Sequence, residues 1–349
     1  MKKYIFINDT STQNNWGCHS TSYHFEKFFR EKELECSEKI FLKDLHDLNK
    51  TIKVASNIDL EGVDYIFVNG EGSIYDRQPK GLNLLKSIKI IKDRKPSLKV
   101  LVVNSTFDIS DKFPEMRDAL KSTSNLVDLY GPREMISCEN LKKMKLSNIF
   151  VQPDFLYQAE IIDNKKYSNT IVIGGNSNYY RGDRIPYDAS EAYSELVYNI
   201  LKNFEYKIIL YSSDNSDYRY LPKIAEKHNV EHVGCKELSW KDGLEILSNA
   251  RMSISGRYHP SIMSLCGVTP CYFLSANNCK MEGTHSFFYS NDDNFSSSHR
   301  LLEDKNKIID WIKKVELNYD DEVVKIQKGL YEMKNRILDF SNKVSEIIS

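Results

Sequence analysis

The chain has 349 residues, a length that predicts about two domains at roughly 150 residues each. The 48 basic side chains nearly balance the 49 acidic ones, and the formal charge of −1 argues against a broad surface for nucleic acids or other polyanions. No apolar run approaches the ~18 residues that a membrane-spanning helix needs. These features favour a soluble protein whose ligand binds at a local site. Hydrophobic residues make up 41% of the chain, enough for a sizeable core in each domain.

The start of the chain and the cysteines indicate a cytoplasmic protein. The apolar run 4–7 ends at Asn8 and Asp9 without a small-residue cleavage site, so it predicts a first β-strand rather than a secretory signal. The seven cysteines are odd in number and form no C-x-x-C pair, which argues against a disulfide framework and a thiolate zinc site. We expect reduced thiols and no bound metal.

Short β-branched or aromatic runs alternate with longer amphipathic stretches along the chain. The expected strands are residues 4–7, 65–68, 100–103, 170–173, 207–211, 252–255 and 270–274. The expected helices include residues 20–32, 82–92, 190–203 and 239–250. This alternation predicts the α/β class, with parallel sheets and crossover helices.

The weakly patterned stretch 154–169 separates two halves that each repeat this alternation. We therefore expect one Rossmann-like domain over residues 1–165 and a second over residues 166–318, facing each other across a central cleft. A helix is expected over residues 319–349.

The C-terminal segment carries one regular apolar seam. Its residues step by three and four: Val323, Ile326, Leu330, Met333, Ile337, Phe340, Val344 and Ile347. Such spacing predicts a long helix. Two interpretations remain open at this point, a coiled-coil homodimer and a terminal helix that packs on the body of its own chain.

The most informative motif is Arg257-Tyr258-His259-Pro260-Ser261, which follows the expected strand 252–255. Pro260 suits the first position of a helix, because its missing N–H would have no partner there. Arg257 and His259 then lie at the carboxyl end of a strand and beside a helix N-terminus, where an anion is favoured. A guanidinium and an imidazole at this place suit a phosphate or a carboxylate.

Further motifs follow the strands of the N-terminal half. Asn69-Gly70-Glu71-Gly72-Ser73 predicts a turn whose glycines let a ligand approach the backbone and whose Ser73 caps the next helix. No Gly-Lys-Ser/Thr follows, so the turn is not a P-loop. Asn15-Trp16-Gly17 follows the first strand, and Gly131-Pro132-Arg133-Glu134 and Gln152-Pro153-Asp154 come later.

Taken in this order, the motifs resemble those of the polysaccharide pyruvyl transferase family over residues 5–285. The carriers of the resemblance are the opening Asn-x-Gly, the glycine-rich turn, the Arg-Glu turn, the Arg-x-His turn, the Gly-x-Pro strand at 267–270 and Lys280. The resemblance implies two Rossmann-like domains similar to GT-B glycosyltransferases. It also implies transfer of pyruvate from phosphoenolpyruvate to a sugar of a cell-surface polysaccharide or its lipid-linked precursor, as a cyclic ketal.

That chemistry suggests roles for individual residues. His259, with an ordinary pKa near ~6.5, can protonate the enol methylene carbon. Arg257 and Arg133 can hold the carboxylate or phosphate, with Lys280, Pro260 and Ser261 beside them on the donor side. Glu71 is the candidate base for the acceptor hydroxyls. The remaining candidates for the acceptor side or the cleft are Asn15, Gly17, His19, Gly70, Gly72, Ser73 and Arg181.

The implied co-substrate is phosphoenolpyruvate, and no cofactor is expected. We place the acceptor side in the first domain and the donor side in the second. The basic run 86–99 offers one route to a lipid-linked acceptor at the inner face of the membrane. The main alternative is a nucleotide-sugar-dependent GT-B glycosyltransferase, in which Arg257 and His259 hold the nucleotide's phosphate and Glu71 deprotonates one acceptor hydroxyl.

Overall fold

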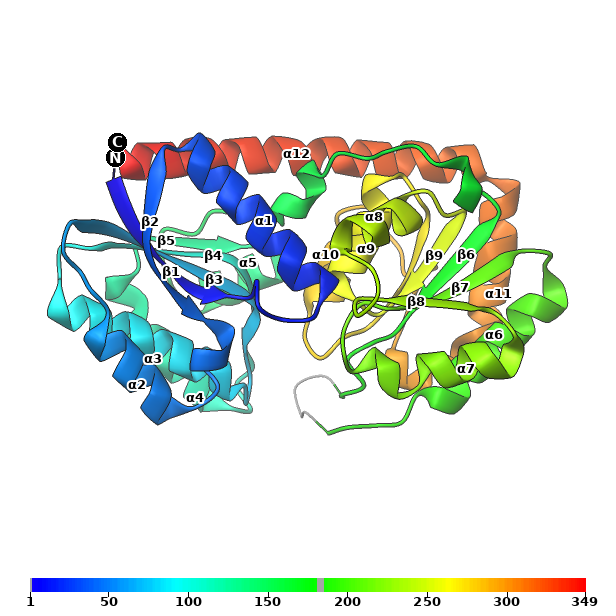
Figure 1. The fold of residues 1–349 in the computed structure, drawn as a ribbon, viewed down its shortest axis with the longest axis horizontal. Helices are drawn as coiled ribbons and strands as arrows, with labels where there is room; N and C mark the ends of the chain where they lie inside the picture. The colour runs from blue at the N-terminus through cyan, green and yellow to red at the C-terminus, as the bar shows by residue number, and fades with distance from the viewer. Residues whose placement is uncertain (1, 181–184) are drawn as a thin grey trace. The chain divides into compact units, whose positions relative to one another are not determined.

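The computed structural model describes residues 2–180 and 185–349. The chain divides into two compact units, each with its own parallel sheet (Figure 1). The first unit comprises Met1–Thr12, Thr21–Asp154 and Asn335–Ser349, and the second comprises Gln13–Ser20 and Phe155–Lys334. We had expected the division between domains to follow residue 165; the contacts within the chain place it after Asp154.

The first unit contains a five-stranded sheet in the order β2-β1-β3-β4-β5, in which every neighbouring pair is parallel. Its strands are β1 (Lys2–Asp9), β2 (Leu34–Phe41), β3 (Val63–Tyr75), β4 (Lys99–Asp108) and β5 (Leu129–Pro132). Its helices are α1 (Trp16–Glu31), which belongs to this unit from Thr21 onward, α2 (Leu48–Asn57), α3 (Pro79–Arg94), α4 (Pro114–Thr123) and α5 (Met135–Lys143).

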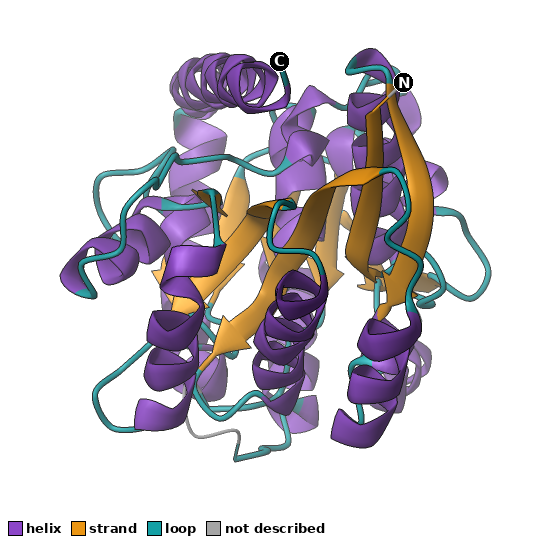
Figure 2. Cartoon of the chain, turned by 90° about the vertical axis from the view of Figure 1, so that its left-hand side faces the viewer, coloured by secondary structure: helices purple, strands orange, loops and turns teal. Residues whose placement is uncertain are grey.

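Strand β1 shows why both faces of this sheet are covered. Successive side chains of a strand point to opposite faces, so Ile5 and Ile7 join one core while Tyr4 and Phe6 join another. The aliphatic core packs under α2, α3 and α4, and the aromatic one packs against Phe25 and other side chains of α1. Figure 2 shows helices on either side of these strands.

The second unit contains a six-stranded parallel sheet in the order β11-β10-β9-β6-β7-β8. Its strands are β6 (Thr170–Gly174), β7 (Lys207–Ser212), β8 (Glu231–Gly234), β9 (Met252–Ser255), β10 (Cys271–Leu274) and β11 (Phe295–Ser296). The helices are α6 (Ser190–Asn203), α7 (Leu221–His228), α8 (Trp240–Ser248), α9 (Tyr258–Cys266), α10 (Lys280–His285), α11 (Leu301–Leu317) and the long α12 (Tyr319–Ile348).

Short 3₁₀ helices complete the described secondary structure: η1 (Leu42–Asp44), η2 (Ser124–Leu126), η3 (Phe155–Gln158), η4 (Lys165–Tyr167), η5 (Asp217–Arg219) and η6 (Ser298–Arg300).

The predicted α/β class and all seven predicted strands are confirmed. Strands β2, β5, β8 and β11 are not among these seven, and all four lie at sheet edges, where a strand has a hydrogen-bonded neighbour on one side only. The predicted turn at residues 69–73 is wrong, because β3 continues through it to Tyr75. Ser73 therefore caps no helix: α3 begins at Pro79, after Gln78.

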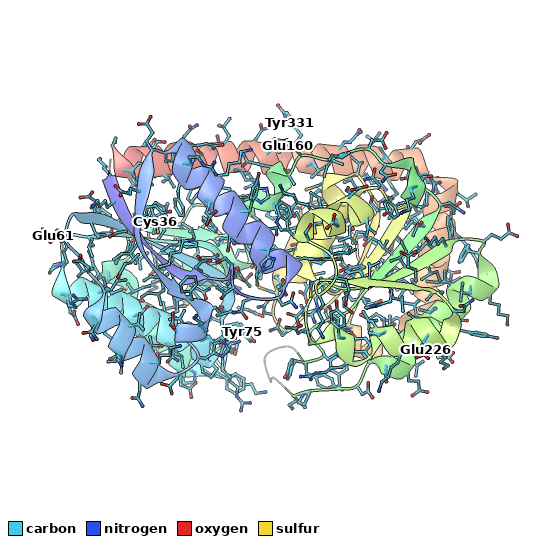
Figure 3. All side chains as sticks on the ribbon, viewed as in Figure 1. Cys36, Glu61, Tyr75, Glu160, Glu226 and Tyr331 are labelled. Carbon is cyan, nitrogen blue, oxygen red and sulfur yellow. The ribbon has the colours of Figure 1, made fainter. Side chains whose placement is uncertain are left out.

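The apolar seam of α12 packs inside the chain. Six of its eight side chains are buried: Ile326, Leu330, Met333, Ile337, Phe340 and Val344. The helix belongs to the second unit up to Lys334 and to the first from Asn335 onward. Its opposite face carries Tyr331, which projects away from the ribbon (Figure 3) and is 71% exposed.

The end of α12 is fastened to the first unit through β1 and β3. Lys2 Nζ donates to the carbonyl oxygens of Ile348 and Ser349, the latter at 3.0 Å, and the Tyr65 hydroxyl donates to Ile348 O at 3.2 Å.

No helix within the described residues is long and apolar enough to cross a membrane.

The buried half of the seam predicts a stability effect. Phe340 is 1% exposed, and its ring centroid lies 6.4 Å from that of Phe28 and 6.3 Å from that of Phe150. Phe340→Ala should lower the free energy of unfolding by about 3–5 kcal/mol, measured by urea denaturation. The control Val324→Ala, at a side chain 62% exposed on the same helix, should change it by less than about 0.5 kcal/mol. Equal effects of the two substitutions would show that the seam is not packed as described.

Candidate functional site

Asn15 and Trp16, at the start of α1, belong to the second unit and bond to other segments of that unit. Asn15 caps the helix, since its Oδ1 accepts a hydrogen bond from Cys18 N at 3.1 Å. The same side chain donates through Nδ2 to Asp214 Oδ2 at 2.8 Å. Trp16 donates its indole N–H to Leu238 O at 2.9 Å and stacks on Tyr211 with ring centroids 6.0 Å apart. Asn15 thus connects the start of α1 to the loop after β7.

Gly17 provides the surface on which the His259 ring lies. A Cβ atom at residue 17 would lie only 2.1 Å from His259 Nδ1 and 2.6 Å from Cγ. Any side chain at this position would therefore push the imidazole out of its place. The Tyr258 ring packs edge-on against the same imidazole, with centroids 5.0 Å apart.

The turn between β9 and α9 carries the predicted anion-binding residues. Arg257 is the N-cap residue of α9, and its carbonyl accepts hydrogen bonds from Ser261 N at 3.1 Å and Ser261 Oγ at 2.9 Å. The helix begins at Tyr258, so Pro260 is its third residue and not its first, as predicted. Pro260 and Ser261 are buried. They hold the turn in shape and leave Arg257 and His259, both half-buried, at its surface.

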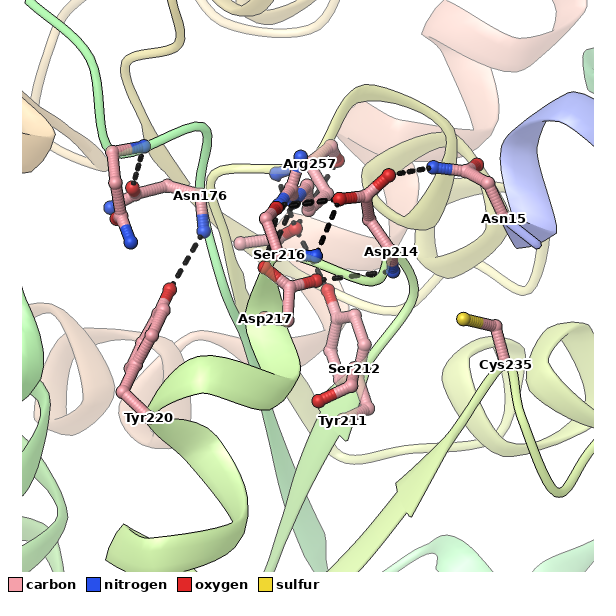
Figure 4. Close-up of polar contacts among 12 residues, drawn as sticks. Asn15, Asn176, Tyr211, Ser212, Asp214, Ser216, Asp217, Tyr220, Cys235 and Arg257 are labelled. Atoms are coloured by element: carbon pink, nitrogen blue, oxygen red, sulfur yellow. Dashed lines mark hydrogen bonds and ion pairs between the residues drawn. The ribbon is translucent and has the colours of Figure 1, made fainter. Parts of the chain in front are cut away.

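The Arg257 guanidinium is anchored along one edge (Figure 4). Nε and Nη2 lie 3.1 and 2.7 Å from Asp217 Oδ1, and Nη2 also donates to Ser216 Oγ. Asp214 Oδ1 lies 3.5 Å from the same Nη2. Within the described part of the chain, no residue bonds Nη1. An incoming anion would therefore meet Nη1, with the orientation of the guanidinium already fixed.

The two carboxylates on Arg257 have opposite pKa shifts. Asp217 has no exposed surface, and burial outweighs the charge of Arg257 and raises its pKa to about 6. Burial also disfavours the charged form of Asp214, but the charge of Arg257 and hydrogen bonds from Ser216 and Asn15 prevail and lower its pKa to about 2. With both carboxylates ionised, this group of three carries a net charge of −1.

Glu71, the predicted base, lies in the first unit on β3 and is half-buried. Its Oε1 accepts hydrogen bonds from Thr10 Oγ1 at 2.7 Å and from Asn69 Nδ2 at 3.0 Å. Among the residues that the structure describes, none donates to Oε2. Gly70 lies against Ser105, whose Oγ would be 1.9 Å from a Cβ at residue 70. Gly72 and Ser73 follow on the same strand and are half-buried.

We had predicted Arg133 at a ligand-facing surface, and this prediction is wrong. It lies inside the first unit, 2% exposed, where Nε donates to Thr106 Oγ1 at 2.8 Å and Nη1 lies 3.9 Å from Asp154 Oδ2. Because a buried guanidinium needs a nearby carboxylate, Asp154 compensates its charge.

The remaining predicted residues lie at separate places. Lys280 is the first residue of α10, and its Nζ donates to Asn277 Oδ1 at 3.2 Å. His19 lies on the first turn of α1 and is half-buried. Arg181 falls outside the described residues.

The sequence analysis missed Asp214, Ser216 and Asp217. They belong to the polar run 213–217, which follows directly after β7. The carboxyl end of a parallel strand is the usual place for ligand-binding residues in this class of fold, so the run carried a usable signal.

The raised pKa of Asp217 predicts a pH-dependent stability. The folded protein holds a proton that the unfolded chain releases, so this contribution to stability is complete below ~3.9 and is lost as the pH rises through about 6. Asp217→Asn mimics the protonated form at every pH. The urea midpoint of Asp217→Asn should therefore increase relative to that of the wild type as the pH rises from 4 to 7.

Asp214→Asn is the matched control for this experiment. Its lowered pKa, about 2, means that both folded and unfolded chains hold the residue ionised through most of that range. The difference in urea midpoint between the wild type and Asp214→Asn should thus stay constant above pH 5. If the difference in urea midpoint between the wild type and Asp217→Asn stays constant from pH 4 to 7, Asp217 is ionised throughout that range.

Comparison with known proteins gives the site its family context. The family model for polysaccharide pyruvyl transferase matches residues 15–278, more than half of the chain. That interval includes Asn15, Gly17, Glu71, Arg257 and His259. A search of curated proteins found no match.

Solved structures share the fold at low sequence identity. A UDP-GlcNAc 2-epimerase from Neisseria meningitidis bound to UDP-GlcNAc matches with a TM-score of 0.60 and 10% identity, over 100% of this chain and 99% of that chain. A putative UDP-N-acetylglucosamine 2-epimerase from Listeria monocytogenes matches with a TM-score of 0.61 and 12% identity, over 93% and 91%. These likenesses support the GT-B-like α/β fold. The match to the family model shows that the chain belongs to the polysaccharide pyruvyl transferase family and is a transferase.

Proposed function

We propose that the protein transfers the pyruvyl group of phosphoenolpyruvate to two hydroxyls of one sugar and releases inorganic phosphate. Two C–O bonds form at the enol carbon, and the C–O bond to phosphate breaks. The two sugar hydroxyls lose two protons. In the overall balance, one proton is added to the methylene carbon, which becomes a methyl group, and the other leaves with the phosphate. The enol carbon rises by one formal oxidation unit and the methylene carbon falls by one, so the net change is zero and no redox cofactor is required.

The observation that carries this proposal is the pairing of Arg257 and His259 on one turn at the start of α9. Nη1 of Arg257 is the available donor for a carboxylate or phosphate oxygen, and its direction is set by Asp217. The imidazole on Gly17 is then the group that delivers a proton to the methylene carbon. The family membership supplies the class of reaction.

On the acceptor side, Glu71 has the chemistry of a general base. Thr10 and Asn69 both donate to Oε1, so the carboxylate is oriented by the interior of the first unit. Oε2 is then the oxygen that takes up protons from the sugar hydroxyls as they attack. We assign the acceptor to the first unit and the donor to the second, and we expect the acceptor to be a surface polysaccharide or its lipid-linked precursor at the inner face of the membrane.

The direct test compares two classes of donor. The purified full chain is incubated with a mixture of methyl hexosides and either phosphoenolpyruvate or a panel of nucleotide sugars. Phosphate release that requires both phosphoenolpyruvate and a sugar is expected. Turnover of a nucleotide sugar, with none of phosphoenolpyruvate, would instead establish the alternative glycosyltransferase.

The contact between Gly17 and His259 predicts a non-additive pair of substitutions. Gly17→Ala should lower kcat/KM on the order of 10²-fold, because it displaces the imidazole. If the effect acts through His259, the double variant Gly17→Ala/His259→Ala should be no less active than His259→Ala alone. If the losses of kcat/KM in the two single variants multiply in the double variant, Gly17 has a role separate from His259. Thermal unfolding of each variant shows whether it folds.

The assignment of Glu71 predicts a loss confined to turnover. Glu71→Gln keeps the shape of the side chain but removes its basicity, so kcat should fall on the order of 10²-fold while KM for phosphoenolpyruvate stays within about twofold. Glu61→Gln is the matched control, since Glu61 is exposed on the surface of the same unit (Figure 3). Full activity of Glu71→Gln would exclude Glu71 as the base.

A further inference from the structure

A short segment near the start of the chain forms part of the second unit's proposed donor site. Residues 13–20 belong to the second unit, although the residues on either side of them belong to the first. We call residues 13–20 the docked segment. The rest of the second unit comes from residues 155–334, so the segment is held there by its contacts and not by its neighbours in the chain.

Trp16 is the anchor of the docked segment. Its side chain is 1% exposed, its backbone N–H donates to Ser213 O at 3.1 Å, and its indole N–H donates to Leu238 O at 2.9 Å. The indole stacks on the Tyr211 ring, with centroids 6.0 Å apart and an angle of 21° between the planes. A buried ring of this size, with its one polar group bonded, is a strong and specific attachment.

Gly243, in α8, leaves the space that the indole occupies. A Cβ atom at residue 243 would lie 2.8 Å from Cδ2 and Cε3 of Trp16 and 2.9 Å from its Cε2. Because ring carbons cannot tolerate so short a contact, any side chain at residue 243 would displace the indole. The absence of a side chain at this position is therefore a requirement for the docking of Trp16.

Trp16 is connected to the backbone of the Arg257 turn through Tyr211. The buried Tyr211 hydroxyl donates to Ser255 Oγ at 2.8 Å, and the same oxygen accepts from Arg257 N at 3.1 Å. The ring on which the indole stacks therefore helps to hold the start of the turn.

The two neighbours of this anchor in the sequence reach the same turn by separate contacts. Asn15 donates to Asp214, which lies beside the Arg257 guanidinium (Figure 4). Gly17 lies against the His259 imidazole. Three consecutive residues are thus connected to three parts of the turn: the guanidinium, the backbone and the imidazole.

We propose that the docked segment and the anionic donor bind the second unit cooperatively, and that Trp16 is the positioning residue that couples them. This rests on the proposed function in taking the Arg257 turn as the donor site. The anion binds more tightly when the segment holds the guanidinium and the imidazole in place. By thermodynamic reciprocity, the bound anion stabilises the docked segment by the same factor.

The test measures anion binding and segment opening without requiring turnover. The Kd values of phosphoenolpyruvate and of inorganic phosphate are measured by calorimetry on the full chain, and hydrogen–deuterium exchange follows the amides of residues 13–20. In the wild type, saturating phosphoenolpyruvate should slow this exchange by at least about fivefold. The physical reason is that exchange requires opening of the segment, and the open form binds the anion weakly.

Two variants loosen the anchor in different ways. Trp16→Phe removes the indole N–H that donates to Leu238 O, and Gly243→Ala places a methyl group against the ring. Alanine is a better helix former than glycine, so Gly243→Ala should not weaken α8 itself. Both variants should raise the Kd of phosphoenolpyruvate about tenfold and speed the exchange of residues 13–20.

Trp311→Phe is the matched control. Trp311 is a buried tryptophan of the same unit, 5% exposed on α11, and its ring packs against Tyr272 with centroids 5.3 Å apart. This substitution should lower the melting temperature but keep the Kd of phosphoenolpyruvate within about twofold of the wild-type value. A purely structural role of Trp16 would give the same result for Trp16→Phe.

The outcomes separate this proposal from the proposed function. Anion-dependent protection of residues 13–20, with weaker anion binding in Trp16→Phe and Gly243→Ala, supports the proposal even if inorganic phosphate is the only anion bound and no pyruvyl transfer occurs. Protection by neither anion overturns it, even if transfer is active. Wild-type Kd values in the folded variants also overturn it. Thermal unfolding shows whether each variant folds, and if one does not, the other decides.

Discussion

The bond between Asp217 and Arg257 organises the turn at the start of α9 that we propose as the donor site. Asp217 has no exposed surface and holds both Nε and Nη2 of the guanidinium, so only the remaining nitrogen can meet a ligand. Asp214 shares Nη2 and is bonded in turn to Asn15, which starts α1. The first turn of that helix then presents Gly17 to the imidazole of His259. One ion pair therefore connects the loop after β7, the turn before α9 and the beginning of α1.

A buried ion pair of this kind does more for geometry than for stability. Removing two charges from water costs about as much as their attraction returns, so the pair's value lies in the direction it gives to Arg257. The same arrangement sets the local charge, since two carboxylates surround one guanidinium. In the proposed reaction, an anionic donor is then best accepted when Asp217 carries a proton.

The sequence predicted those parts of the fold that depend on local pattern. Buried strands such as β9 and the seam of α12 have apolar periods that can be recognised without a structure, and the motif order identified the family. Edge strand β2 has no such period because only two of its eight residues are buried. Arg133 looked like a ligand-facing cation, but its burial against Asp154 depends on residues distant in sequence. The partners of Arg257 were missed for the same reason, although Asp214 and Asp217 follow closely after strand β7.

The central claim is that the enol carbon of phosphoenolpyruvate becomes a ketal carbon on a sugar. Carbon-13 NMR of a reaction with [2-¹³C]phosphoenolpyruvate follows that atom directly. The account predicts that the enol signal is replaced by that of a quaternary carbon bonded to two sugar oxygens, with one phosphate released per carbon transferred. Label that stays in phosphoenolpyruvate, or appears only in free pyruvate while a sugar acceptor is bound, would contradict it.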